Sequence, residues 1–301
     1  MKVIIKHWII WLIFTSFICC SCDKTQRAWI PVSGDGYIYY EEKGQGEALI
    51  LLHGHSLDTR MWDAQFDAFA QHYRCIRFDF RGYGQSSKQR EDFQMTHLDD
   101  LLTVMDTLRI EKAHIVGLSM GSFVAGDMLA MAPERMLSCV MASGGIRSVK
   151  GPSEPMDAEE SARRDQEIAA LKAKGIDVYK REWLDALVAD GGSRREEIRA
   201  DLWQMIHDWD AWQALHKEVR LFWAREAWQR LEATCPTVPT LMLRGDAKGE
   251  NKAYRPKELK FLPNGRSLLL PDCGHMMNME QPETFNKVVL DFLQNLPSSE
   301  E

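Results

Sequence analysis

Short apolar runs alternate with amphipathic stretches along most of the chain. Runs with the length and composition of β-strands lie at residues 28–32, 37–41, 48–53, 75–80, 113–118, 137–142, 240–244 and 267–270. Helical periodicity is found at 60–69, 97–108, 121–132 and 282–296. The run at 48–53 is almost entirely apolar, which is typical of a strand buried on both faces. This alternation predicts an α/β fold with a mostly parallel central sheet and helices on both faces.

One long segment interrupts the alternation. Residues 147–234 contain no convincing strand, and they are charged and favour helix. Insertions that follow the carboxyl ends of strands lie over the site in such sheets, so the segment is interpreted as a helical lid between two core segments, 22–146 and 235–301. Its tryptophans either anchor the lid helices or line a substrate pocket beneath them. They are Trp183, Trp203, Trp209, Trp212, Trp223 and Trp228.

The N-terminus has the pattern of a targeting segment. Lys2 and Lys6 precede an apolar run from Trp8 to Ile18, which is shorter than the roughly 20 residues that span a membrane. Ser21-Cys22 then resembles the processing site of a bacterial lipoprotein, although Cys19 stands where an aliphatic residue is usual. We expect residues 1–21 to be a signal peptide and a lipid on Cys22 to be the only membrane attachment of an exported protein. Simple secretion, an uncleaved anchor and an apolar cytoplasmic tail are the alternatives.

Charge and cysteine content further limit the classes of protein to which the chain can belong. The formal net charge of the 301 residues is −7, which is unfavourable for a protein that binds nucleic acid by neutralising phosphates. Cys75 and Cys139 lie in strand-like runs, where a lone cysteine is usually a small buried apolar residue, so disulfides are not favoured although export would permit them. Beyond the leader there is no C-x-x-C spacing and in the whole chain no H-E-x-x-H spacing, so no metal site is predicted.

The segment Gly117-Leu118-Ser119-Met120-Gly121 has the G-x-S-x-G pattern of a nucleophile elbow. A predicted strand precedes it and a predicted helix follows it, and this context makes a short pattern specific. A sharp turn there places the Ser119 hydroxyl above the sheet edge, at a helix N-terminus that favours developing negative charge. Ser119 is the predicted nucleophile.

The segment His53-Gly54-His55-Ser56 follows the predicted strand at 48–53. The backbone N–H of His55 can pair there with that of Met120 to form an oxyanion hole. This role uses the main chain, so the His55 imidazole need not act as a base. His53 is expected to orient the loop through hydrogen bonds.

A third motif, Asp272-Cys273-Gly274-His275, follows the last predicted strand. A histidine late in the chain on a glycine-preceded loop suits a general base in the order serine, acid, histidine. His275 is therefore the predicted base.

These segments resemble the α/β-hydrolase superfamily, and in particular its esterase, enol-lactonase and perhydrolase branch. The resemblance extends from near residue 28 to the final helix, and the lid is its least specific part. It rests on L-L-H-G-H-S-L-D-T-R-M-W-D-A-Q-F, F-D-F-R-G-Y-G-Q-S-S, G-L-S-M-G-S and P-D-C-G-H-M-M-N-M-E-Q-P-E. It implies the α/β-hydrolase fold, and a serine nucleophile argues against the dehalogenases and epoxide hydrolases of the superfamily, which use an aspartate.

The triad acid departs from the pattern of the family. Members commonly place it three residues after the glycine that ends the strand before the last, which here is Gly245, and that position holds Lys248. The nearby carboxylates are Asp246, which directly follows the glycine, and Glu250. Asp246 is the predicted acid, with Glu250 as the alternative and a site without a functional acid as a third possibility.

Together the motifs predict a serine hydrolase that cleaves a carboxylic ester or a related acyl bond without a metal or organic cofactor. Met120, Met276, Met277 and the lid tryptophans suggest a pocket for a small, apolar acyl substrate. A lyase or carbon–carbon bond hydrolase with the same triad is one alternative. A lipoprotein that binds a ligand without turnover is another, and Lys248 is its main support.

Overall fold

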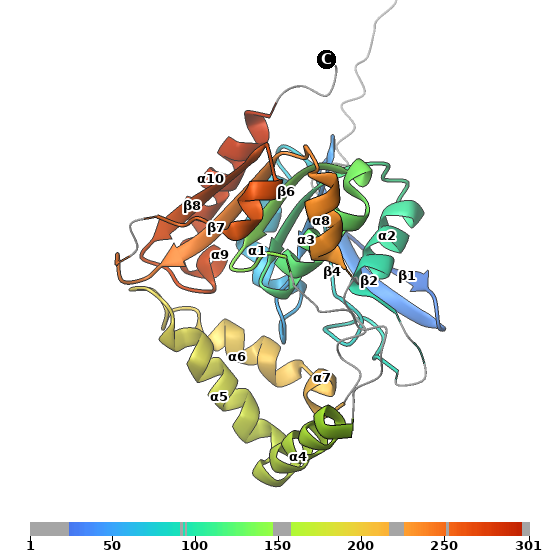
Figure 1. Ribbon diagram of the computed structural model, residues 1–301, viewed down its shortest axis with the longest axis vertical. Helices are drawn as coiled ribbons and strands as arrows, with labels where there is room; N and C mark the ends of the chain where they lie inside the picture. Colours follow the sequence, from blue (N-terminus) through green and yellow to red (C-terminus); the bar gives the residue numbers. More distant parts are fainter. Residues whose placement is uncertain are drawn as a thin grey trace, which may run out of the picture.

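The structure is a computed structural model that describes residues 24–90, 93, 95–146, 158–216, 226–250 and 253–296. Within these ranges one sheet has the strand order β1-β2-β4-β3-β5-β6-β7-β8 (Figure 1). β2 pairs antiparallel with β1 and β4, and the other neighbouring pairs are parallel. The strands are β1 (Gln26–Val32), β2 (Gly36–Lys43), β3 (Ala48–Leu52), β4 (Arg74–Phe78), β5 (Ala113–Leu118), β6 (Met136–Ala142), β7 (Thr240–Asp246) and β8 (Gly265–Pro271). The predicted α/β architecture is confirmed.

Helices follow most of the parallel strands. They are α1 (Asp63–Phe69), α2 (His97–Thr107), α3 (Met120–Met131), α4 (Ala158–Lys174), α5 (Ile176–Ala189), α6 (Arg199–Asp208), α7 (Trp212–Leu215), α8 (Ala227–Thr234), α9 (Met277–Glu280) and α10 (Pro282–Gln294). Short 3-10 turns occupy Thr59–Trp62, Pro133–Arg135 and Lys257–Phe261. The helix predicted at 60–69 therefore begins as a 3-10 turn and continues as α1.

The sheet is buried on both faces because side chains alternate along its central strands. In β3, Leu49 and Leu51 face the core that contains α1 and α10, whereas Ile50 and Leu52 face the core that contains α2, α3 and α8. All five residues of β3 are buried, as its apolar sequence predicts. Two hydrophobic layers thus hold the strand ends in fixed positions.

The segment interpreted as a lid is helical wherever it is described. α4 to α7 form a group beyond the carboxyl ends of the strands in Figure 1. α8 packs against α3 on the sheet, so the last helix of the predicted lid belongs to the layer that covers the core. Residues 147–157 and 217–225, which include Trp223, lie outside the described ranges.

The predicted leader and Cys22 also lie outside the described residues. Among the residues that are described, no helix has the length and apolarity needed to cross a membrane. Cys75, Cys139 and Cys273 are buried free thiols, and Cys235 is an exposed one.

Candidate active site

Ser119 lies between β5 and α3 in a strained backbone conformation, with φ 54° and ψ −114°. A non-glycine residue with positive φ costs about 1–3 kcal/mol and persists only where the surroundings impose it. Here the surroundings are backbone: a Cβ on Gly117 would lie 2.2 Å from the carbonyl oxygen of Gly121, and one on Gly121 would lie 2.0 Å from that of Leu52. The glycines of the motif are therefore required by close packing of the main chain, which turns the serine out of the sheet.

The loop after β3 runs directly beside the serine. A Cβ built on Gly54 would lie 3.6 Å from the Cβ of Ser119. Within the described residues, the backbone N–H groups of His55 and Met120 have no hydrogen-bond acceptor. Two unpaired donors next to a serine are suited to bind an oxyanion. The structure therefore places both predicted donors at the elbow.

His53 fixes this loop, as the sequence predicts. Its Nε2 accepts a hydrogen bond from the backbone N–H of Phe80 at 2.9 Å, so its Nδ1 donates to the carbonyl of Gly54 at 2.8 Å. Burial lowers the pKa of His53 to about 4, which keeps the ring neutral.

The His55 side chain meets aromatic residues from the core and from the lid. Its Nδ1 lies 2.8 Å from the Tyr83 hydroxyl, and its ring packs edge-on against Trp183 and Trp209 at centroid distances of 6.0 and 4.8 Å. The indole N–H of Trp183 also donates to Ser56 Oγ at 2.7 Å. Burial lowers the pKa of His55 to about 4, so the ring is neutral near pH 7. These two tryptophans therefore anchor the lid on the loop after β3, and Trp209 is itself buried in the core.

His275 is attached to the same strand end as Ser119. The Ser143 hydroxyl donates to the carbonyl of His275 at 2.7 Å, and the adjacent residue, Ala142, accepts a hydrogen bond from the backbone N–H of Ser119 at 2.9 Å. Burial lowers the pKa of the His275 imidazole, and the negative charge of Asp190 opposes this shift. In the described part of the molecule no hydrogen bond joins the His275 ring to Ser119. The main chain therefore attaches the loops of the predicted nucleophile and base to adjacent residues of one strand end.

Asp246 is the last residue of β7 and is only 8% exposed. Its Oδ1 accepts a hydrogen bond from the backbone N–H of Glu250 at 3.2 Å, so the carboxylate takes part in the turn that follows its own strand. Among the described residues, neither Asp246 nor Glu250 forms an ion pair with His275. Both predicted acids line the same cavity as His275, and the role of Asp246 stays a prediction.

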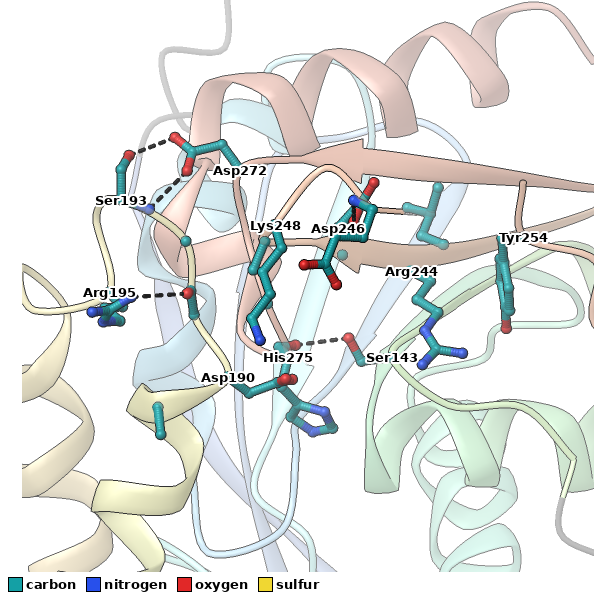
Figure 2. A pocket seen from close by; sticks show the side chains of 18 of the residues that line it. Ser143, Asp190, Ser193, Arg195, Arg244, Asp246, Lys248, Tyr254, Asp272 and His275 are labelled. Carbon is teal, nitrogen blue, oxygen red and sulfur yellow. Dashed lines mark hydrogen bonds between the residues drawn. The ribbon is translucent and has the colours of Figure 1, made fainter. Parts of the chain in front are cut away.

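Sequence reasoning missed Asp190, the residue that follows α5. Figure 2 shows its carboxylate beside the His275 ring. Asp190-Gly191-Gly192 after an amphipathic helix is a turn signal, but nothing in the sequence connects this turn to a histidine more than 80 positions later.

A cavity of about 760 Å³ lies between the turn after α5 and the carboxyl ends of β7 and β8 (Figure 2). His275 faces it, but Ser119 is not among its lining residues. Its charged lining residues, besides the aspartates at 190, 246 and 272, are Arg195, Arg244, Lys248 and Glu250. Met276 and Met277, which the sequence suggested as pocket residues, are instead buried in the core with α1 and α10. Among the described residues there is no cluster of three or more side chains that could hold a metal ion.

This fold and elbow define a class of enzyme, and comparison with known proteins agrees. The model of the alpha/beta hydrolase family matches residues 49–288, and the chain belongs to that family. The chain is 30% identical to a 2-hydroxy-6-oxononadienedioate/2-hydroxy-6-oxononatrienedioate hydrolase from Paraburkholderia phymatum over 281 residues, which cover 85% of this chain and 90% of the relative. It is 28% identical to a putative non-heme bromoperoxidase from Mycobacterium tuberculosis, and the match covers 85% of this chain and 97% of the relative.

Solved structures show the same fold. A thermophilic esterase from Thermogutta terrifontis, in a malate-bound structure, matches with a TM-score of 0.70 and 24% identity over 89% of this chain and 98% of the esterase. An enol-lactonase from Burkholderia xenovorans matches with a TM-score of 0.68 and 22% identity, over 89% of this chain and 100% of the lactonase. At these identities the likeness shows the fold and does not identify a substrate.

Proposed function

We propose that this chain is a serine hydrolase that cleaves a carboxylic ester or a related acyl bond through an acyl-enzyme on Ser119. The observation that supports this best is the strained backbone of Ser119 at the end of a buried strand, beside two N–H groups that find no acceptor among the described residues. Strain of this kind is maintained by the surrounding packing and is typical of functional residues. Membership of a hydrolase family supports the same chemistry.

The proposed reaction has two halves. Neutral His275 takes the proton of Ser119 Oγ as the oxygen attacks the acyl carbon, and the N–H groups of His55 and Met120 bind the resulting oxyanion. His275 then protonates the leaving alcohol as the carbon–oxygen bond breaks. Water, activated by the same imidazole, cleaves the acyl-enzyme and restores the serine. Hydrogen bonds between such groups are often long in the absence of substrate, which is consistent with the lack of a hydrogen bond between the His275 ring and Ser119 among the described residues.

The surroundings of the oxyanion loop favour a small substrate with an apolar acyl group. The half-buried Trp183 packs edge-on against the His55 ring, which the buried Tyr83 and Trp209 support from the core. Aromatic side chains supply large apolar contact area at low entropic cost. The polar cavity near His275 would then take the more polar portion of the substrate.

Labelling with a fluorophosphonate probe tests the proposal, because the probe reacts only with an activated serine. We expect the wild-type protein to be labelled on Ser119 and to hydrolyse p-nitrophenyl esters. Ser119→Ala should abolish both, whereas Ser33→Ala, a change at an exposed turn serine, should alter neither. A folded wild-type protein that is neither labelled nor active would support a binding protein instead.

A carbon–carbon bond hydrolase or lyase with the same groups is the second candidate. It is favoured by the named dienedioate substrate of the Paraburkholderia phymatum relative and by three cations, Arg195, Arg244 and Lys248, that line the cavity beside His275. Such cations would suit a carboxylate of the substrate. A panel of p-nitrophenyl esters of increasing acyl length, assayed beside a 2-hydroxy-6-oxodienedioate, separates the candidates by the larger kcat/KM.

We also propose that the mature protein is exported and anchored through a lipid on Cys22. The support is the positive N-terminus, the short apolar run and the Ser21-Cys22 pair. Mass spectrometry of membrane-associated protein should find acylated Cys22 at the N-terminus, and Cys22→Ala should abolish the acylation while Cys20→Ala preserves it. A soluble cytoplasmic protein that retains Met1 would contradict this proposal.

A further inference from the structure

The turn after α5 is bound tightly to the loop that carries His275. Glu280, which is 1% exposed, accepts hydrogen bonds from the backbone N–H of Gly192 at 2.6 Å and from that of Gly274 at 2.9 Å. One buried carboxylate therefore connects the lid to the histidine loop. Hydrogen bonds to a charged acceptor contribute about 1.5–3 kcal/mol each, so this connection is a strong one.

A second carboxylate makes the same connection from the other side. Asp272 accepts hydrogen bonds from both the backbone N–H and the hydroxyl of Ser193, the first of these at 2.7 Å. The lid turn and the histidine loop also touch through their backbones. A Cβ on Gly274 would lie 1.8 Å from the carbonyl oxygen of Asp190, and one on Gly192 would lie 2.2 Å from that of Asp272. This packing fixes Asp190 next to the histidine loop.

The place where an acid is usual in this family holds a cation. Lys248 stands three residues after Gly245, and Figure 2 shows its side chain directed toward His275 and Asp190. The Asp246 carboxylate accepts a hydrogen bond from the backbone N–H of Glu250 in the turn after β7. The lid contributes another carboxylate to the cavity that His275 lines, that of Asp190.

We propose that Asp190, carried on the lid, is the positioning residue whose charge stabilises the His275 imidazolium during catalysis. Asp190 and His275 line the same cavity, and their side chains lie beside each other in Figure 2. α5 ends at this cavity, so the negative end of its dipole adds to the charge of Asp190. Asp190 also opposes the fall in the pKa of His275 that burial causes. The two groups form no ion pair in this structure, and a rotation of the exposed Asp190 side chain would bring them together. The inference rests on the proposed serine mechanism.

Four variants of the full chain test this assignment: Asp190→Asn, Asp190→Glu, Asp246→Asn and, as a matched control at the other end of α5, Asp177→Asn. The readouts are kcat and KM for a p-nitrophenyl ester and the pH dependence of kcat/KM. Asp190→Asn should lower kcat by about 10²- to 10⁴-fold with little change in KM, by analogy with the loss of a triad acid. It should also shift the acidic limb of the profile to lower pH, because a negative charge that raises the pKa of His275 has been removed. Asp190→Glu should recover part of the activity.

Asp177→Asn should have the kcat and KM of the wild-type protein. Asp246→Asn should lower kcat less than about tenfold and leave the acidic limb of the pH profile unchanged. Thermal unfolding of each variant checks that the fold is retained. The assignment is overturned if Asp190→Asn keeps the wild-type kcat and pH profile, or if Asp246→Asn causes the larger loss. These outcomes require a wild-type enzyme that reacts with a fluorophosphonate at Ser119. Without that reaction the serine mechanism itself fails.

Discussion

The two sides of the site are held in place by different kinds of contact. Ser119 is positioned by main chain alone: two buried strands, two glycines without space for a side chain and a hydrogen bond to the carbonyl of Ala142. The loop of His275 is joined to the lid by the side chains of Glu280 and Asp272. The nucleophile therefore depends on local backbone geometry, and the environment of the base depends on contacts between distant segments.

Removal of the serine hydroxyl should have the largest effect on activity and the smallest effect on the fold. Ser119→Ala is expected to lower kcat by about 10⁴-fold or more, because the nucleophile of the triad is lost. Thermal unfolding should remain close to that of the wild-type protein, because the hydroxyl makes no hydrogen bond within the described residues. Steady-state assays on protein purified free of contaminating esterase check this, and retained turnover would exclude the serine mechanism.

A change in the backbone contacts of the elbow should act on stability instead. In Gly121→Ala the new Cβ would lie 2.0 Å from the carbonyl oxygen of Leu52, and neither backbone can move without disturbing the central sheet. We expect the free energy of unfolding to fall by about 3 kcal/mol or more, in the range of severe core overpacking. Gly249→Ala is the control for loss of a glycine, since a Cβ there meets nothing within 4 Å, although its φ of 66° will cost some strain. Urea denaturation measures both, and equal losses would show that packing at the elbow is unimportant.

On the other side of the site, Glu280→Gln should loosen the lid turn. A glutamine can accept only one of the two N–H hydrogen bonds through its oxygen, and its own N–H₂ group would face the other donor. We expect a loss of about 1–3 kcal/mol and faster amide exchange at residues 190–193. Glu134→Gln, at an exposed position in the turn between α3 and β6, is the control. Unchanged exchange in the Glu280 variant would show that its carboxylate does not hold the turn.

The smallest effect concerns pH. Burial lowers the pKa of His275 below its ordinary value of 6.5, and neutral imidazole is the form that accepts the serine proton. The kcat/KM for ester hydrolysis should therefore rise with pH to a plateau, with its midpoint below 6.5, and activity should be lost as the pH falls through that midpoint. A profile measured from pH 4 to 9 tests this, and a midpoint above 6.5 would mean that a negative charge outweighs burial.

The contrast between the Ser119 elbow and the His275 loop also explains which features could be predicted from the sequence. The apolar run of β3 and the glycines at 117 and 121 predict the sheet and the elbow, because their constraint lies in the local backbone. The contact of Asp190 with the histidine loop could not be predicted, nor could the bond from Gly192 to Glu280, because both are tertiary contacts between segments more than 80 positions apart. The flexible side chain of Met277 suggests a pocket residue, but Met277 begins α9 and packs into the core.

The attachment of Ser119 and His275 to neighbouring residues of one strand end has a mechanical consequence. Ala142 holds the backbone of the serine, and Ser143 holds the backbone of the histidine. A displacement of β6 would carry both loops in the same direction and preserve the distance between them. The lid turn at residues 190–193 is bound to the histidine loop through Glu280 and Asp272, so Asp190 would follow the same displacement. The relative positions of nucleophile, base and lid turn would therefore survive a shift of the strand that none of the three belongs to.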